Sequence, residues 1–197
     1  MHTNDRVLGG RLPLLDPKQL EGDQETLYKL LNSTFITWAE ASGFKGRTDD
    51  GKLIGPFNPN LYSPGITPSW IHLVQAESKT TSLSKRAHEI VIIAVASVWE
   101  APYALYAHAA VARDAGVPEN AIKALAAGGS ANHLSPEEQV AYRFARQLAA
   151  ERKVSEGLYR EAEAIFGQAG LVDMVYLIGI YLLTCALLNA FEIPAPE

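Results

Sequence analysis

The sequence predicts an all-α fold. Apolar residues recur at three- and four-residue spacings in several long segments, as on one face of an amphipathic helix. No segment shows the sustained alternation of apolar and polar residues that indicates a strand. The chain of 197 residues is 48% hydrophobic and 20% charged, which suits a protein that buries a core and excludes a wholly disordered one.

Residues 23–42 form the first predicted helix. Its apolar side chains lie on one face: Leu27, Leu30, Leu31, Phe35 and Trp38. In residues 46–68, by contrast, glycine and proline interrupt every regular element. Five side chains of this segment gain from burial: Leu53, Ile54, Phe57, Leu61 and Tyr62. We therefore expect a long ordered loop packed over the core.

The next predicted helix begins after Ser84, a favourable N-cap residue. Residues 90–98 are apolar nearly all round, as expected for a helix buried on several sides. Pro102 cannot lie inside that helix, but it suits the first turn of another one. We therefore expect a break at residues 99–101 and a second helix that ends before Gly116.

The rest of the chain is also predicted to be helical. A short helix starts at Pro118 and runs to Leu125. A longer one follows Ser135, where the sequence S-P-E-E forms a capping box with Glu138. Two more helices are expected at about residues 155–166 and 171–190.

Residues 1–80 are expected to form an N-terminal arm, a helix and the Gly/Pro-rich loop. They are predicted to pack on a helical core of residues 81–197 as one structural unit. The helix over 171–190 is hydrophobic around most of its circumference, and one layer of neighbours in a small monomer does not cover such a surface. We therefore expect a homo-oligomer.

The formal net charge of −5 argues against nucleic acid and anionic membranes as partners, because both need a basic surface. The longest apolar run, residues 174–188, is shorter than the roughly 20 residues of a membrane span. The N-terminus has no apolar segment behind a basic start, which a secretory signal needs. These features favour a cytoplasmic location.

Cys185 is the single cysteine, so the chain cannot build an internal disulfide or a C-x-x-C redox pair. In its apolar helix, burial is expected to raise the pKa of the thiol and make it unreactive. None of the five histidines has a partner at metal-ligand spacing on a helix. We therefore expect no metal site.

Glu89 and His108 are the residues most suited to proton transfer. A continuous helix would hold them roughly 28 Å apart, but the break before Pro102 lets the second helix fold back across the first. We expect the two side chains to lie within hydrogen-bonding reach. From the residues alone, the alternative is a surface glutamate and a histidine that is merely satisfied in the core.

The segment Ser84–Leu125 resembles the carboxymuconolactone decarboxylase family, which has the AhpD-like fold. The likeness rests on Glu89, on the pattern A-x-x-A-x-x-x-H and on the sequence A-R-D-A-G-V-P after it. Redox members of the family carry E-x11-C-x-x-C-x-x-x-H. Glu89 and His108 stand at the same spacing, and Ala101 and Ala104 occupy the two cysteine positions. The sequence D-G-K-L-I-G-P-F-N at residues 50–58 resembles the longer members.

The resemblance implies an AhpD-like helical bundle and a trimer or hexamer. Peroxide reduction needs one attacking and one resolving thiol, so we expect neither peroxidase nor thiol–disulfide reductase activity. The decarboxylase branch uses no metal or organic cofactor. By this likeness the protein is a cofactor-free decarboxylase or related lyase, acting on a cyclic or unsaturated, lactone-type carboxylate in aromatic compound catabolism. A peroxidase-like antioxidant role and non-catalytic small-molecule binding are the alternatives.

Each candidate residue has an expected role in such a reaction. His108 delivers the proton, since histidine titrates near neutral pH, and Glu89 sets its tautomer and supports its protonated form. Tyr103 donates a hydrogen bond to a developing oxyanion. The expected substrate-binding residues are Trp99, Tyr106, Phe57 and Asn58.

Overall fold

The structure is a computed structural model, and it describes residues 8–130 and 132–197. The first seven residues of the predicted N-terminal arm lie outside the described residues. The described residues form helices and one isolated bridge between Arg47 and Leu53, with no strand among them. The predicted all-α fold is confirmed.

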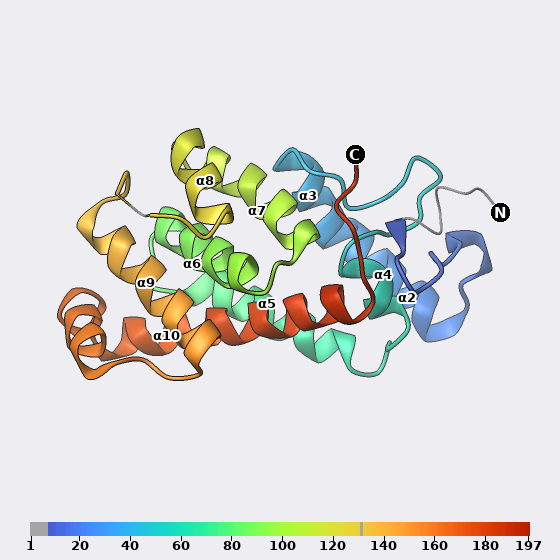
Figure 1. The fold of residues 1–197 in the computed structure, drawn as a ribbon. Coiled ribbons are helices and arrows are strands. Elements are labelled where there is room, and N and C mark those ends of the chain that lie inside the picture. The colour runs from blue at the N-terminus through green and yellow to red at the C-terminus, as the bar shows by residue number, and fades with distance from the viewer. Residues whose placement is uncertain (1–7, 131) are drawn as a thin grey trace.

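The centre of the molecule is α6, Lys85–Val98. It starts as predicted, with the Ser84 hydroxyl accepting a hydrogen bond from the Ala87 amide. Residues 89–96 are buried on every face because four helices pack around α6 (Figure 1). These are α7 (Pro102–Asp114), α8 (Glu119–Ala126), α9 (Pro136–Glu151) and α10 (Glu156–Ala190).

The turn between α6 and α7 reverses the chain direction. Glu100 takes a left-handed φ of 50°, Ala101 is extended, and Pro102 lies in the first turn of α7, where no amide donor is missed. The Asn189 side chain of α10 donates to the Trp99 carbonyl at 2.6 Å and holds this turn from outside. As predicted, α7 folds back along α6.

The last predicted pair of helices forms α10, which one non-helical residue divides into two helices. Gly167 has φ 65° and ψ 175° inside α10, so the residues on either side of it are helical and this residue is not. By length and composition α10 is apolar enough to cross a membrane. Its inward residues, such as Met174, Leu177 and Cys185, are buried in the core.

The N-terminal part builds a second hydrophobic cluster. The predicted helix over 23–42 consists of α2 (Gly22–Leu31), a π-helical turn (Asn32–Ile36) and α3 (Thr37–Ala41), after a 3-10 turn at Pro17–Gln19. Its apolar face meets side chains from the segment that follows. The cluster comprises Leu20, Leu27, Leu31, Ile36, Leu53, Phe57, Leu61 and Ile71.

The segment predicted as an ordered loop contains two helical elements, α4 (Phe57–Leu61) and the start of α5 (Thr67–Thr80). The prediction missed α5 because Pro68 was taken as an interruption. It stands in the first turn of α5, where proline favours a helix. Tyr62 remains 41% exposed, and its hydroxyl donates to the Pro13 carbonyl.

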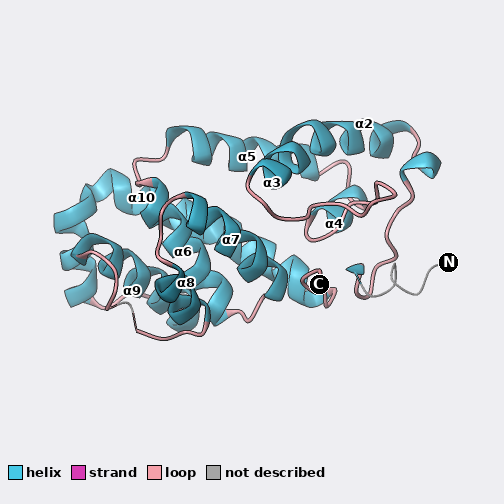
Figure 2. Cartoon of the chain, turned by 90° about the horizontal axis from the view of Figure 1, so that it is seen from above, coloured by secondary structure: helices cyan, strands magenta, loops and turns pink. Residues whose placement is uncertain are grey.

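Figure 2 shows α2, α3 and α5 along one side of the molecule and α6–α9 along the other. The predicted boundary near residue 80 falls at the link between α5 and α6. The division into residues 1–80 and 81–197 stays a prediction. The arrangement matters for function because residues of both parts line the same cavity.

Candidate active site

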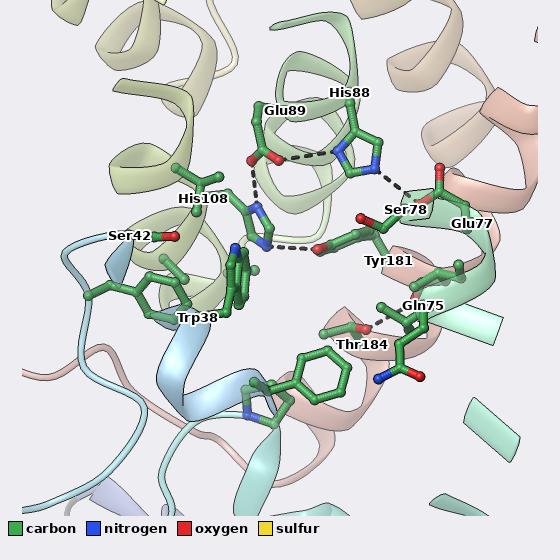
Figure 3. Close-up of a pocket in the computed structure, with 18 of the residues that line it drawn as sticks. Trp38, Ser42, Gln75, Glu77, Ser78, His88, Glu89, His108, Tyr181 and Thr184 are labelled. Carbon is green, nitrogen blue, oxygen red and sulfur yellow. Dashed lines mark hydrogen bonds and ion pairs between the residues drawn. The ribbon is translucent and has the colours of Figure 1, made fainter. Parts of the chain in front are cut away.

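The fold-back of α7 brings Glu89 and His108 together. Glu89 Oε2 and His108 Nδ1 are 2.7 Å apart, and both side chains are buried (Figure 3). The sequence-based expectation of a hydrogen bond between them is met. Both residues occupy the inward faces of their helices, where the surrounding positions are apolar.

Glu89 is ionised at neutral pH. Burial by itself would raise the pKa of the carboxyl group, but the charge and hydrogen bond of His108, with those of His88, lower it to about 2. A carboxylate only accepts hydrogen bonds, so Nδ1 of His108 must carry the proton of the 2.7 Å contact. Glu89 therefore fixes the tautomer of His108 and leaves Nε2 as the second functional atom.

Nε2 of His108 meets Tyr181, a residue of α10. The tyrosine Oη lies 2.8 Å from Nε2, and the two rings stand almost perpendicular at 4.8 Å. Burial, and then the negative charges of Glu89 and Glu77, raise the pKa of Tyr181 well above 10, so it remains a neutral phenol. Sequence reasoning missed Tyr181, whose signal was a hydroxyl group within an otherwise apolar helix.

The hydrogen-bonded chain continues on the other side of Glu89. His88 Nδ1 lies 3.2 Å from Glu89 Oε1, and His88 Nε2 lies 3.1 Å from Glu77 Oε2 of α5. Burial alone would lower the pKa of His88, but hydrogen bonds and charges from Glu77 and Glu89 raise it to about 9. His88 is therefore a cation at neutral pH. We call Glu77–His88–Glu89–His108–Tyr181 the polar chain.

The polar chain forms one wall of a cavity of about 660 Å³. This size lies within the usual range for small-molecule sites. The opposite walls are mainly aromatic: Phe35, Trp38, Phe44, Phe57, Trp70 and Tyr103. Figure 3 shows Trp38, His108, Tyr181 and Thr184 around the same central space. Segments far apart in the sequence thus build one concave site.

Two of the expected supporting residues line this cavity. Phe57 is a wall, as predicted. Tyr103 also contributes a wall, but its hydroxyl donates to the Lys45 carbonyl at 2.6 Å. Burial raises the pKa of Tyr103 far above its usual range. In this arrangement its proton is directed at the backbone, away from the position of a substrate oxyanion.

The three other predicted substrate-binding residues are not among those that line the cavity, and each has a hydrogen bond elsewhere. Asn58 accepts from the Leu15 amide and donates to the Pro13 carbonyl. The Tyr106 hydroxyl accepts from the Lys45 amide. The Trp99 carbonyl accepts a hydrogen bond from the Asn189 side chain, and this bond stabilises the turn before α7. The substrate-binding role of Asn58, Trp99 and Tyr106 stays a prediction, which the lining of this cavity does not support.

The site has no cysteine at the two positions where the resembled family's redox members carry one. Ala104 lines the cavity and Ala101 is buried at the start of α7, where redox members of the family carry cysteines. Cys185 is buried in α10, and burial raises the pKa of its thiol to about 12. Within the described residues, no group of three or more His, Cys, Asp or Glu side chains is placed to hold a metal ion.

The described residues form an all-helical bundle with a buried carboxylate–imidazole pair beside a cavity. Residues 64–147 match the model of the carboxymuconolactone decarboxylase family. This segment contains Glu89 and His108, and the fold of the chain is similar to that of AhpD-like proteins. A search of curated proteins found no match to the sequence.

Solved structures share the fold at low sequence identity. An uncharacterized peroxidase-related protein with an AhpD core, from Ralstonia eutropha JMP134, has 15% identity and a TM-score of 0.72 over 96% of this chain and 93% of that one. A peroxidase-related protein from Silicibacter sp. TM1040 has 15% identity and a TM-score of 0.68 over 96% and 93%.

A third similar structure is a cysteine-to-alanine variant of the debrominase Bmp8 in complex with 2,3,4-tribromopyrrole. It has 13% identity and a TM-score of 0.71 over 95% of this chain and 94% of that one. Identities this low establish a common fold and leave the chemistry to be argued from the site.

Proposed function

We propose that this protein is a cofactor-free acid–base enzyme that decarboxylates a cyclic or unsaturated carboxylate, or performs a related lyase step on it. The observation that carries the proposal is the Glu89–His108–Tyr181 arrangement on the wall of the cavity. It joins an ionised carboxylate, an imidazole of fixed tautomer and a neutral phenol in one line. These three groups are of the kinds that proton-transfer sites use.

In the proposed reaction the bond between the substrate carbon and its carboxylate breaks. Carbon dioxide leaves, and the electron pair stays on the substrate as a dienolate-like carbanion. His108, neutral at rest, takes up one proton from water in each turnover. It then passes its Nε2 proton to Tyr181 as the Tyr181 hydroxyl proton goes to the substrate carbon, and this transfer returns His108 to its neutral form. The carboxylate of Glu89 stabilises the imidazolium during this cycle.

The walls of the cavity support the same proposal. Three of the aromatic side chains, Phe44, Phe57 and Tyr103, are buried and keep water from their side of the cavity, which strengthens the electrostatic contacts there. They also suit a flat, unsaturated substrate. The fold neighbour Bmp8 was solved with a small aromatic ring, 2,3,4-tribromopyrrole, which is compatible with a ring-binding cavity in this fold.

A peroxidase-like function has less support. It needs two thiols, and this chain has alanine at both positions and one cysteine whose pKa is raised to about 12. Non-catalytic binding of a small molecule in the same cavity is the stronger alternative. It requires the cavity but not the proton-transfer chain, so a substitution of His108 distinguishes the two.

The test is a screen of lactone carboxylates and β-keto acids for release of carbon dioxide. We expect at least one class to turn over with the wild-type protein and to lose turnover in His108→Ala. Release of carbon dioxide that is unchanged in a folded His108→Ala protein would remove the proposed role. Binding of these compounds with no turnover of any of them would favour the non-catalytic alternative.

We also propose that the protein is a cytoplasmic homo-oligomer. Beside Leu73 of α5, the outward face of α10 exposes the apolar side chains Val172, Val175, Tyr176 and Leu183. These residues line an apolar groove whose burial by another copy would lower the free energy of the assembly. A trimer or hexamer is the form that the family resemblance favours.

A further inference from the structure

The direction of the hydrogen bonds determines what Tyr181 offers to a ligand. Nδ1 of His108 donates to the Glu89 carboxylate, so Nε2 of the neutral imidazole carries a lone pair. The Tyr181 hydroxyl then donates its single proton to Nε2. Its oxygen keeps only lone pairs for a molecule in the cavity. In this resting form Tyr181 is an acceptor, and the best partner for an acceptor is an O–H or N–H group.

The charges around the cavity favour the same kind of partner. Within the buried part, two carboxylates, Glu77 and Glu89, face one imidazolium, His88. Two lysines line the cavity, Lys79 and Lys85. Both lie on its exposed rim, as does Asp114. No arginine lines the cavity among the described residues. An anionic group that enters the deep part therefore loses its hydration and gains few favourable charges in return. A neutral donor carries no charge that needs such compensation.

The shape of the walls adds the third constraint. Phe35 and Trp70 are stacked at 5.8 Å, and Phe57 lies 6.0 Å from Phe35. Trp38, three residues after Phe35 on the same helical segment, lies 6.3 Å from the His108 ring. Such aromatic surfaces favour contact with the faces of a planar ring.

We infer that the deep part of the cavity binds a planar aromatic or enolic ring whose O–H or N–H group donates a hydrogen bond to Tyr181 Oη. This inference rests on the proposed function only in sharing its site, and it adds the class of ring that the enzyme takes.

The experiment compares pairs of ligands that differ in one proton. Calorimetric titration measures the Kd of 2-naphthol and of 2-methoxynaphthalene, which keeps the ring and the oxygen but has no donor. The same comparison is made for 3-hydroxy-2-naphthoate and 3-methoxy-2-naphthoate. We expect the hydroxyl compound to bind about five- to tenfold more tightly in the neutral pair, as one net hydrogen bond provides.

Tyr181→Phe completes a double-mutant cycle, in which one change is made in the ligand and the other in the protein. It removes the acceptor and keeps the ring, so the preference for 2-naphthol over 2-methoxynaphthalene should shrink by about five- to tenfold, whatever the steric effect of the methyl group. The matched control is Tyr142→Phe. Tyr142 is buried in α9, and its hydroxyl donates to the Gly129 carbonyl at 3.1 Å, outside the cavity lining. This control should keep the wild-type preference.

Equal affinities of the two neutral ligands for the wild-type protein would overturn the inference, and so would an unchanged preference in Tyr181→Phe. If Tyr181→Phe does not fold, a crystal structure of the wild-type protein with 2-naphthol decides. The naphthol oxygen should lie about 3 Å from Tyr181 Oη, and a naphthol oxygen elsewhere in the cavity would refute the contact. Binding of the neutral pair without turnover of any carboxylate would leave this inference standing and defeat the decarboxylase proposal.

Discussion

The inner and outer faces of α10 have different surroundings, although one apolar sequence forms both. On the inner face, Tyr181 completes the polar chain and Thr184 is buried at the cavity wall. On the outer face, Val172, Tyr176 and Leu183 are 55%, 58% and 49% exposed. Hydrophobicity along a helix therefore does not tell a site from an uncovered surface. The neighbours that reach each face make the difference.

The largest expected effect concerns the polar chain. His108→Ala removes the group that exchanges protons with Tyr181, so turnover per folded molecule should fall about 10²- to 10⁴-fold, with a much smaller change in substrate affinity. The measurement is the rate of carbon dioxide release, normalised to folded protein, with thermal unfolding run in parallel. A purely structural pair would give a less stable protein with normal turnover.

Glu89→Gln tests how much the charge of the Glu89 carboxylate contributes to turnover. The amide keeps the shape but loses the charge that stabilises the imidazolium, so turnover should fall by less than in His108→Ala. The loss of the carboxylate also leaves His88 with one ionic partner, Glu77. We therefore expect a stability loss of about 1–3 kcal/mol, measured by denaturant unfolding. A larger loss of turnover than in His108→Ala would show that Glu89 itself contacts the reacting atoms.

The outer face of α10 is tested by its state of association. Light scattering should give a mass several times the 21.4 kDa of one chain. Leu183→Glu places a charge in the proposed contact and should shift the mass toward that of one chain. Ile165→Glu is the control, because Ile165 is 41% exposed on α10 but does not line the groove. A wild-type monomer at micromolar concentration would refute the assembly.

The polar chain also predicts a pH dependence of stability. The pKa of His88 is raised to about 9 in the folded protein from the 6.5 of an unperturbed histidine, so its stabilising contribution is complete below pH 6.5 and is lost as the pH rises through 9. The loss should be of the order of 1–3 kcal/mol. For Glu89, with a pKa lowered from 4.5 to about 2, the contribution is present above pH 4.5 and is lost toward pH 2.

The measurement is the free energy of unfolding between pH 5 and pH 10 for the wild-type protein and for His88→Gln. The variant has no imidazolium at this position, so its stability should decline less over the alkaline range. Parallel curves for the two proteins would mean that His88 is not held as a cation by Glu77 and Glu89.

The smallest effect is expected at Cys185. Cys185→Ser should leave turnover per folded molecule unchanged, because the buried thiol has a pKa raised to about 12 and lies outside the cavity lining. A loss of turnover in the folded variant, or inactivation of the wild-type protein by a thiol reagent without unfolding, would assign the thiol a role.

Much of the helical core follows from local chemistry. The capping box at Ser135, the cap at Ser84 and the proline at residue 102 act on neighbouring residues, so their positions predict where α9, α6 and α7 begin. The prediction failed for α5 because a proline can either end a helix or stand in the first turn of a new one. The local sequence does not decide between these roles for Pro68, and the structure places it in the first turn of α5.

The sequence by itself determined the helical class of the protein and the reversal before Pro102, because both depend on short-range preferences. It allowed Glu89 to meet His108, and the family resemblance favoured that meeting over a surface glutamate and a core histidine. Tertiary structure alone decided that Glu77, His88 and Tyr181 join this pair, and that Asn58, Trp99 and Tyr106 hold loops instead. The physical reason is distance along the chain. A hydrogen bond such as that between His108 and Tyr181 depends on how α7 and α10 pack, and no local pattern encodes that packing.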